Sequence, residues 1–149
     1  MKKLVFAAAL ILAVGIYSSY ADSIVTVNKR VAASFHRDFD GAKDVSWQSA
    51  PTYIKATFSL GDHILFAYYS QEGDLIAVVR NILSDHLPIL LQSDLKRQYR
   101  EFWVTDLFEM ATDEQSTYYV TIESADQTLV LRSSGEGWTL FKKYRKLTI

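Results

Sequence analysis

The chain has 149 residues, of which 16 are Lys or Arg, 17 are Asp or Glu, three are His and none is Cys. About half of the residues (49%) are hydrophobic and 13% are aromatic, which excludes a disordered or low-complexity chain. The formal net charge of -1 lacks the basic excess of nucleic-acid-binding proteins, so no nucleic-acid partner is expected. Without Cys, the chain has no disulfide framework, thiolate zinc site or cysteine nucleophile.

The first 21 residues have the pattern of a secretory signal peptide. A basic start at Lys2 and Lys3 precedes an apolar run, Leu4–Tyr17, and the small residues Ser19 and Ala21 mark a cleavage site. The alternative is a membrane anchor, but this run of 14 residues is shorter than the roughly 17–25 residues that span a bilayer. We therefore expect a periplasmic or secreted product with no stable membrane insertion after cleavage.

The rest of the chain carries a weak internal repeat. A shift of 64 residues aligns residues 54–82 with residues 118–146, and six of the 29 aligned pairs are identical. The identities include Gly73 and Gly137, which lie where the chain must turn and where glycine can take a positive φ. Chance similarity between two amphipathic hairpins is the alternative to a duplication.

The first repeat is predicted to begin with a helix. Its apolar residues recur every four positions, as a buried helical stripe requires, at Val27, Val31, Phe35 and Phe39. Asn28 is a candidate N-cap, and Asp40-Gly41 ends the helix. Strands are expected at Val45–Gln48, Tyr53–Leu60, His63–Ser70 and Asp74–Asn81.

The second repeat has the same order of elements. Pro88 marks a helix entry, and the apolar stripe that follows consists of Leu91, Leu95, Tyr99 and Phe102. Strands are expected near Trp103–Met110, Thr117–Ser124, Thr128–Ser133 and Trp138–Arg145.

The predicted fold class is therefore α+β. Two tandem repeats, about 25–82 and 83–149, would each form a helix followed by three to four antiparallel strands, with the helices packed on one face of the sheet. No linker rich in proline or glycine separates the repeats, so residues 22–149 are expected to form a single domain.

The opening of the first repeat resembles the PepSY-like, or β-lactamase-inhibitor-like, family of small secreted bacterial proteins. The resemblance begins with Val31-x-x-Ser34-Phe35-x-x-x-Phe39-x-x-Ala42-x-x-Val45-x-Trp47 and continues through the Tyr53–Phe58 strand, the Tyr68-Tyr69-x-x-Glu72-Gly73 turn and Leu87-Pro88. The proline common before the first helix of the family is absent here. The resemblance implies a sheet with helices on one face, and an open face that binds an enzyme as in β-lactamase inhibitor protein.

The sequence carries no motif for a known chemistry. Gly-x-Ser-x-Gly, His-Glu-x-x-His, a phosphate-binding glycine loop and a calcium loop are all absent. The three histidines, His36, His63 and His86, lack the short spacings of a zinc site. Asp38, Asp40 and Asp44 follow the first helix, where solvated carboxylates are common, although an acid/base pair is an alternative. No metal, cofactor or catalytic residue is therefore predicted.

A basic run near the C-terminus has two interpretations. It consists of Lys142, Lys143, Arg145 and Lys146. A solvated edge strand is favoured over contact with anionic lipid or a polyanion, because lysine also blocks edge-to-edge pairing of sheets.

Strand alternation predicts a candidate binding surface on the face opposite the helices. This face is expected to expose a mixture of aromatic and cationic side chains, namely Tyr53, Phe66, Tyr68, Tyr119 and Arg132. Such a mixture is typical of protein-binding patches. The alternatives are a dimer contact or a face covered by a loop, and Phe66 would suit a core equally well.

Three functions remain open on the sequence alone. The favoured one is a non-catalytic extracytoplasmic binding module, an inhibitor or modulator of a secreted or periplasmic enzyme, whose partner is a protein of the cell envelope or secreted fraction. The first alternative is a small-ligand carrier with a cleft between the repeats. The second is an enzyme of unrecognised type, with Asp38, Asp40 or His36 as its acid/base group.

Overall fold

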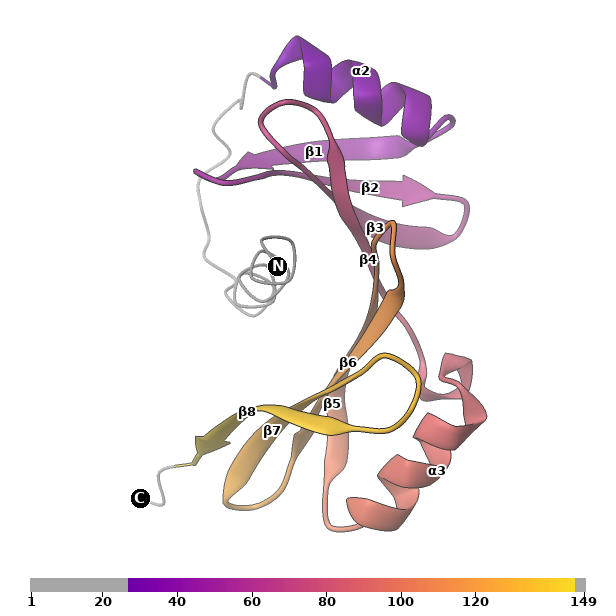
Figure 1. Ribbon diagram of the computed structural model, residues 1–149, viewed down its shortest axis with the longest axis vertical. Coiled ribbons are helices and arrows are strands. Elements are labelled where there is room, and N and C mark those ends of the chain that lie inside the picture. The colour runs from indigo at the N-terminus through magenta and orange to yellow at the C-terminus, as the bar shows by residue number, and fades with distance from the viewer. Residues whose placement is uncertain (1–26, 147–149) are drawn as a thin grey trace.

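The computed structural model describes residues 27–146 (Figure 1), and the predicted signal peptide at residues 1–21 lies outside the described residues. The first half of this part contains α2 (Lys29–Asp38), β1 (Lys43–Ser49), β2 (Ile54–Leu60), β3 (His63–Tyr69) and β4 (Leu75–Asn81). The second half contains a short 3-10 helix, η1 (Ser84–His86), then α3 (Ile89–Gln98), β5 (Trp103–Ala111), β6 (Ser116–Glu123), β7 (Gln127–Ser133) and β8 (Thr139–Arg145). The predicted strand positions are confirmed to within a few residues. Both helices are found where they were predicted but end earlier than their apolar stripes, because Phe39 and Tyr99 are C-caps and Phe102 lies beyond α3.

All eight strands belong to one antiparallel sheet, in which each strand pairs with its neighbours in the chain, in the order β1 to β8. The sheet is strongly curved. Figure 1 shows α2 and α3 on its outer side, near opposite ends, so that the inner side is free of both helices. We call this inner side the concave face.

The predicted architecture of two helix-and-strand repeats is wrong. The described chain is mostly a single eight-stranded sheet, and its two α-helices have only 10 residues each. The two sets of strands are merged because β4 pairs with β5 through four residue pairs, from Val78–Ala111 to Asn81–Phe108. This pairing removes the two free edges that separate repeats would leave, with their unpaired N–H and C=O groups. We call this junction the seam.

Helix α2 forms where the sequence supplies a cap and an apolar stripe. The Asn28 side chain accepts a hydrogen bond from the Arg30 N–H at 2.9 Å, which satisfies one of the free donors of the first turn. Val31 and Phe35 on the buried side of α2 pack against β2 and β3 in what we call the α2 cluster. The ring of Phe35 lies 4.9 Å from that of Phe58, at right angles to it.

The turn between β3 and β4 is tied to the start of the same helix. Gly73 has a φ of +97°, and a Cβ added there would lie 3.3 Å from the backbone carbonyl carbon of Arg30. The Asn28 side chain also donates a hydrogen bond to the Gln71 carbonyl oxygen at 3.0 Å. Gly73 is therefore required both for its backbone conformation and for the close approach of the turn to the helix.

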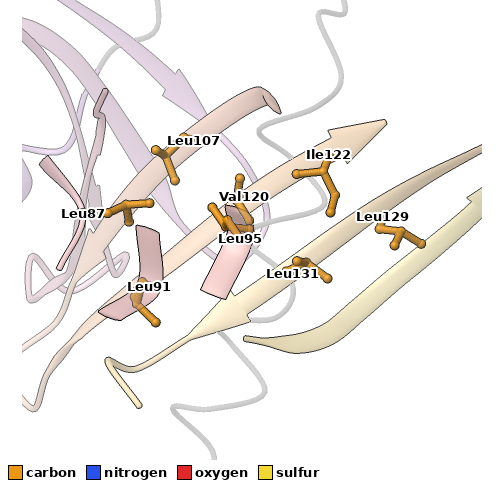
Figure 2. Close-up of a cluster of buried hydrophobic side chains, with 8 residues drawn as sticks. All are labelled: Leu87, Leu91, Leu95, Leu107, Val120, Ile122, Leu129 and Leu131. Atoms are coloured by element: carbon orange, nitrogen blue, oxygen red, sulfur yellow. The ribbon is translucent and has the colours of Figure 1, made fainter. Parts of the chain in front are cut away.

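Helix α3 covers the other end of the sheet. Eight buried aliphatic side chains form the α3 cluster, and Figure 2 shows how those of the helix, of the segment before it and of three strands converge: Leu87, Leu91, Leu95, Leu107, Val120, Ile122, Leu129 and Leu131. The Trp138 indole Nε1 donates a hydrogen bond to the Leu91 carbonyl oxygen at 2.9 Å. This bond holds the turn between β7 and β8 against the helix.

On its outer side, the seam carries one apolar pair, Val78 and Ala111, and one charged pair. Arg80 and Glu109, which are paired across the seam, form an ion pair at 2.7 Å. On the concave face of the seam, a third apolar cluster is buried. None of the helices in residues 27–146 is long and apolar enough to cross a membrane.

Candidate functional site

The middle of the concave face is an aromatic and aliphatic cluster that spans the seam. We call it the central cluster; its buried members are Tyr68, Ala77, Val79, Phe108, Met110 and Tyr119, and Tyr53, Phe66, Ile76 and Phe141 pack against them while partly buried. Its rings meet edge to face or stacked: Tyr53 and Tyr68 at 5.4 Å, Phe108 and Tyr119 at 5.1 Å, and Tyr119 and Phe141 at 5.8 Å. These contacts fix the rings relative to one another.

The strand register places all five predicted binding residues on this face. Tyr53 and Phe66 pack against the central cluster, Tyr68 and Tyr119 are part of it, and Arg132 is the partner of Tyr119 on β7. The expectation that all five are exposed is wrong, because Tyr68 and Tyr119 are only 1% and 2% exposed. Burial raises the pKa of both phenols, and the nearby Arg132 opposes this effect at Tyr119.

Cations lie above the aromatic rings at the border of the central cluster. The Lys55 Nζ lies 4.7 Å from the centre of the Phe66 ring, and burial lowers the pKa of this lysine. In the other half, the Arg132 guanidinium lies 6.0 Å and the Lys142 Nζ 5.8 Å from the centre of the Phe141 ring. Such contacts keep the cations directed over an apolar floor.

Two exposed aromatic residues lie on the same face, beyond the central cluster. Trp103 and Tyr144 are 52% and 51% exposed, and they occupy the two ends of a row in which Trp103 pairs with Glu123, Glu123 with Thr128, and Thr128 with Tyr144. The Lys146 Nζ bonds Glu123 at 2.6 Å and lies 5.2 Å from the Trp103 ring. We call Trp103, Glu123, Tyr144 and Lys146 the C-terminal rim.

The sequence did not predict this rim or Phe141, because bulges interrupt the regular alternation of side chains between the two faces of the sheet. The register shifts between Val104 and Asp106 on β5, and again where Val130 and Leu131 on β7 face β8. Each bulge changes which residues face inward, so counting every second residue assigns the wrong face beyond it. A signal did exist for Tyr144, a large aromatic residue within the basic run from Lys142 to Lys146.

Of the three carboxylates predicted near the end of the first helix, Asp38, the last residue of α2, has structural partners. The Tyr69 hydroxyl donates a hydrogen bond to the Asp38 Oδ2 at 3.2 Å, and the Arg37 Nε bonds the Oδ1 of the same carboxylate at 3.0 Å. Within residues 27–146, no three His, Asp or Glu side chains lie close enough together to hold a metal ion. Asp38 thus joins β3 to the end of the helix.

A shallow pocket of about 490 Å³ lies between α3 and the turn from β7 to β8. Its lining is polar and includes Asp94, Glu136 and the buried Ser133. Because this pocket lies at one end of the molecule, it is not the cleft between halves that a small-ligand carrier was expected to use.

Comparisons with known proteins show the fold. No protein-family model matches the chain, and no curated protein matches it in sequence. Solved structures do match: a DUF2874 family protein from Bacteroides uniformis is 14% identical with a TM-score of 0.71, over 79% of this chain and 88% of that one. A BLIP-like protein from Bacteroides fragilis is 13% identical with a TM-score of 0.69, over 86% and 89% of the two chains.

A third solved structure, described as a candidate periplasmic protein of Bacteroides eggerthii, is 10% identical with a TM-score of 0.71, over 80% of this chain and 88% of that one. These matches support the β-lactamase-inhibitor-like part of the resemblance seen in the sequence, while the PepSY part stays a prediction. At such low identities the likeness establishes the fold alone. This chain has the fold of BLIP-like and DUF2874 family proteins.

Proposed function

We propose that this protein is a non-catalytic binding module that acts outside the cytoplasm and holds a protein partner on its concave face. The partner would belong to the cell envelope or secreted fraction, and binding would inhibit or modulate a secreted or periplasmic enzyme. The predicted signal peptide supports this location, and the fold shared with a BLIP-like protein is compatible with an inhibitor.

The observation that carries the proposal is the composition of the concave face. A helix-free, inward-curved surface presents Trp103, Tyr144 and Arg132 as exposed side chains. Trp, Tyr and Arg are the residue types that dominate binding energy in protein interfaces. Around them, the half-buried Tyr53 and Phe66 offer further apolar area.

The buried tyrosines have a different role in this proposal. Tyr68 and Tyr119 lie beneath the surface that a partner would touch, and their neighbours hold them in fixed orientations. A rigid floor lowers the entropy that a surface loses when it binds. Tyr68 and Tyr119 would thus support the binding surface rather than form its contacts.

The test is capture of a partner from the native envelope fraction by purified variants. Trp103→Ala and Arg132→Ala should each weaken capture, by roughly thirtyfold if the side chain contributes about 2 kcal/mol, and leave the melting temperature nearly unchanged. Ile89→Ala is the matched control, because Ile89 is 74% exposed but lies on α3, on the outer side of the sheet. Equal capture by all three variants would refute a role of the concave face.

A further inference from the structure

The last strand of the sheet, β8, has an open edge on its outer side. It pairs with β7 alone, and no further strand of residues 27–146 lies beyond it. The backbone of β8 therefore carries N–H and C=O groups that face away from the sheet, and the register shows which residues they belong to.

Residues 143 and 145 direct their backbone groups outward. The Lys146 N–H donates to the Asp126 carbonyl oxygen at 2.8 Å, and the Ser124 N–H donates to the Gln127 carbonyl oxygen at 2.9 Å on the opposite side of β7. Because the direction of backbone groups alternates along an antiparallel strand, Lys142, Tyr144 and Lys146, which follow the bulge of β8, direct their backbone groups toward β7. Lys143 and Arg145, between them, have N–H and C=O groups free to bond to another strand.

The charge of this edge is strongly positive. Four of the five residues from 142 to 146 are cationic, and among residues 27–146 only Lys146 of these four forms an ion pair, with Glu123. Lys143 and Arg145 are opposite Leu129 and Gln127, so they lie on the outer side of the sheet, whereas Lys142 lies on the concave face. The edge thus carries cations on both sides of the strand.

These cations select what can pair with β8. A second copy of the same edge would place its cations opposite those of β8, and like charges directly opposite each other destabilise a strand pair. Pairing of an acidic strand with β8 is stabilised by the same cations, because opposite charges across two strands attract. The other edge of the sheet, β1, holds one Lys and one Asp and has no such preference.

From this geometry we infer that β8 is a second binding site, which takes up an extended acidic segment of a partner protein as a ninth strand. Hydrogen bonds to the backbone of Lys143 and Arg145 would hold the segment, and every second side chain of it would be a carboxylate facing these two cations. The site is separate from the concave face, so it does not depend on the proposed function above.

The test uses two synthetic peptides of equal charge and of about eight residues, the length of a long strand. In the first, Glu alternates with Thr; in the second, Glu alternates with Pro, which cannot donate backbone hydrogen bonds. We expect the Glu–Thr peptide to bind the full chain at least tenfold more tightly in fluorescence anisotropy. We also expect it to slow hydrogen exchange at the Lys143 and Arg145 amides but not in β1.

Arg145→Pro and Arg145→Ala separate the backbone from the charge. Arg145→Pro removes an N–H that does not bond to β7, so we expect the sheet to be retained and binding of the Glu–Thr peptide to be lost. Arg145→Ala removes the charge but keeps the N–H, so we expect it to weaken binding less. If Arg145→Pro does not fold, the comparison of the two peptides on the unaltered chain stands alone. Equal binding of both peptides, no binding of either, tighter binding to phosphatidylglycerol vesicles, or a dimer joined through β8 would each overturn the inference.

Discussion

Trp138 and Leu91 are joined by a hydrogen bond of 2.9 Å, although 47 residues separate them in the chain. The indole N–H is thereby satisfied while the ring packs on the α3 cluster. One side chain thus fixes both the position of the turn between β7 and β8 and the contact of that turn with the helix.

Trp138→Phe should therefore destabilise the protein by about 1–2 kcal/mol, since it removes one hydrogen bond and part of the ring but keeps an aromatic group in place. Urea unfolding followed by circular dichroism measures the change. Ser134→Ala, at an exposed position in the same turn, is the control and should change stability by less. An unaltered midpoint for Trp138→Phe would show that the hydrogen bond does not contribute.

Phe35→Ala should be severely destabilising. Phe35 is 1% exposed and its ring touches those of Phe39, Trp47 and Phe58, at 5.5, 5.1 and 4.9 Å. Removal of a buried aromatic side chain costs about 3–5 kcal/mol, a large part of the roughly 5–15 kcal/mol that holds a domain together. A melting temperature equal to that of the parent protein would contradict the packing of α2 on the sheet.

Alkaline pH should destabilise the fold. Burial is the main cause that raises the pKa of Tyr68, Tyr69 and Tyr119, and at Tyr69 the negative charge of Asp38 adds to it. In the unfolded chain, tyrosine loses its proton as pH passes about 10, whereas these folded residues keep theirs. The unfolded state then binds fewer protons, so stability is complete below about pH 10 and falls as pH rises above it.

The free energy of unfolding, measured in urea at a series of pH values, tests this expectation. Tyr69→Phe removes one of the three groups, so the decline above about pH 10 should be less steep in this variant. The same slope in the variant and the parent would mean that Tyr69 is not protected from ionisation by folding.

The mature protein should begin at Asp22. The signal peptidase accepts small side chains at Ser19 and Ala21, and intact-mass measurement on exported material identifies the cleavage site. Replacement of Ala21 by a bulky residue should leave precursor in the membrane. Exported protein that retains Met1 would be incompatible with the predicted signal peptide.

Local features of the fold could be predicted from the sequence, because they depend on neighbouring residues. The stripe that includes Val31 and Phe35 and the cap at Asn28 define α2, and runs of alternating residues define the strands. The continuous sheet could not be predicted in this way. It depends on the pairing of Val79 with Met110, which lie on strands separated by a helix. Nothing in the sequence around either residue indicates that the two are paired.

The sequence predicted which face of the sheet carries the candidate site, but not how deeply its residues are buried. Alternation correctly assigned Tyr68 and Tyr119 to the side opposite the helices. It could not show their burial, because the curvature of the sheet, which brings side chains of different strands together, is a property of the whole sheet. The exposed positions, such as Trp103, lie beyond a bulge that the sequence does not mark.

The four-pair seam between β4 and β5 has a consequence for the shape of the concave face. The α2 and α3 clusters lie on either side of it and share no residues, whereas Val79 and Met110 of the central cluster sit directly at it, 2% and 3% exposed. We expect larger or smaller side chains at these two positions to alter the packing across the seam and to leave both helix clusters intact, because neither residue belongs to them. If a partner binds on the concave face as proposed, the fit of this face to the partner would depend in part on Val79 and Met110, which are themselves almost inaccessible.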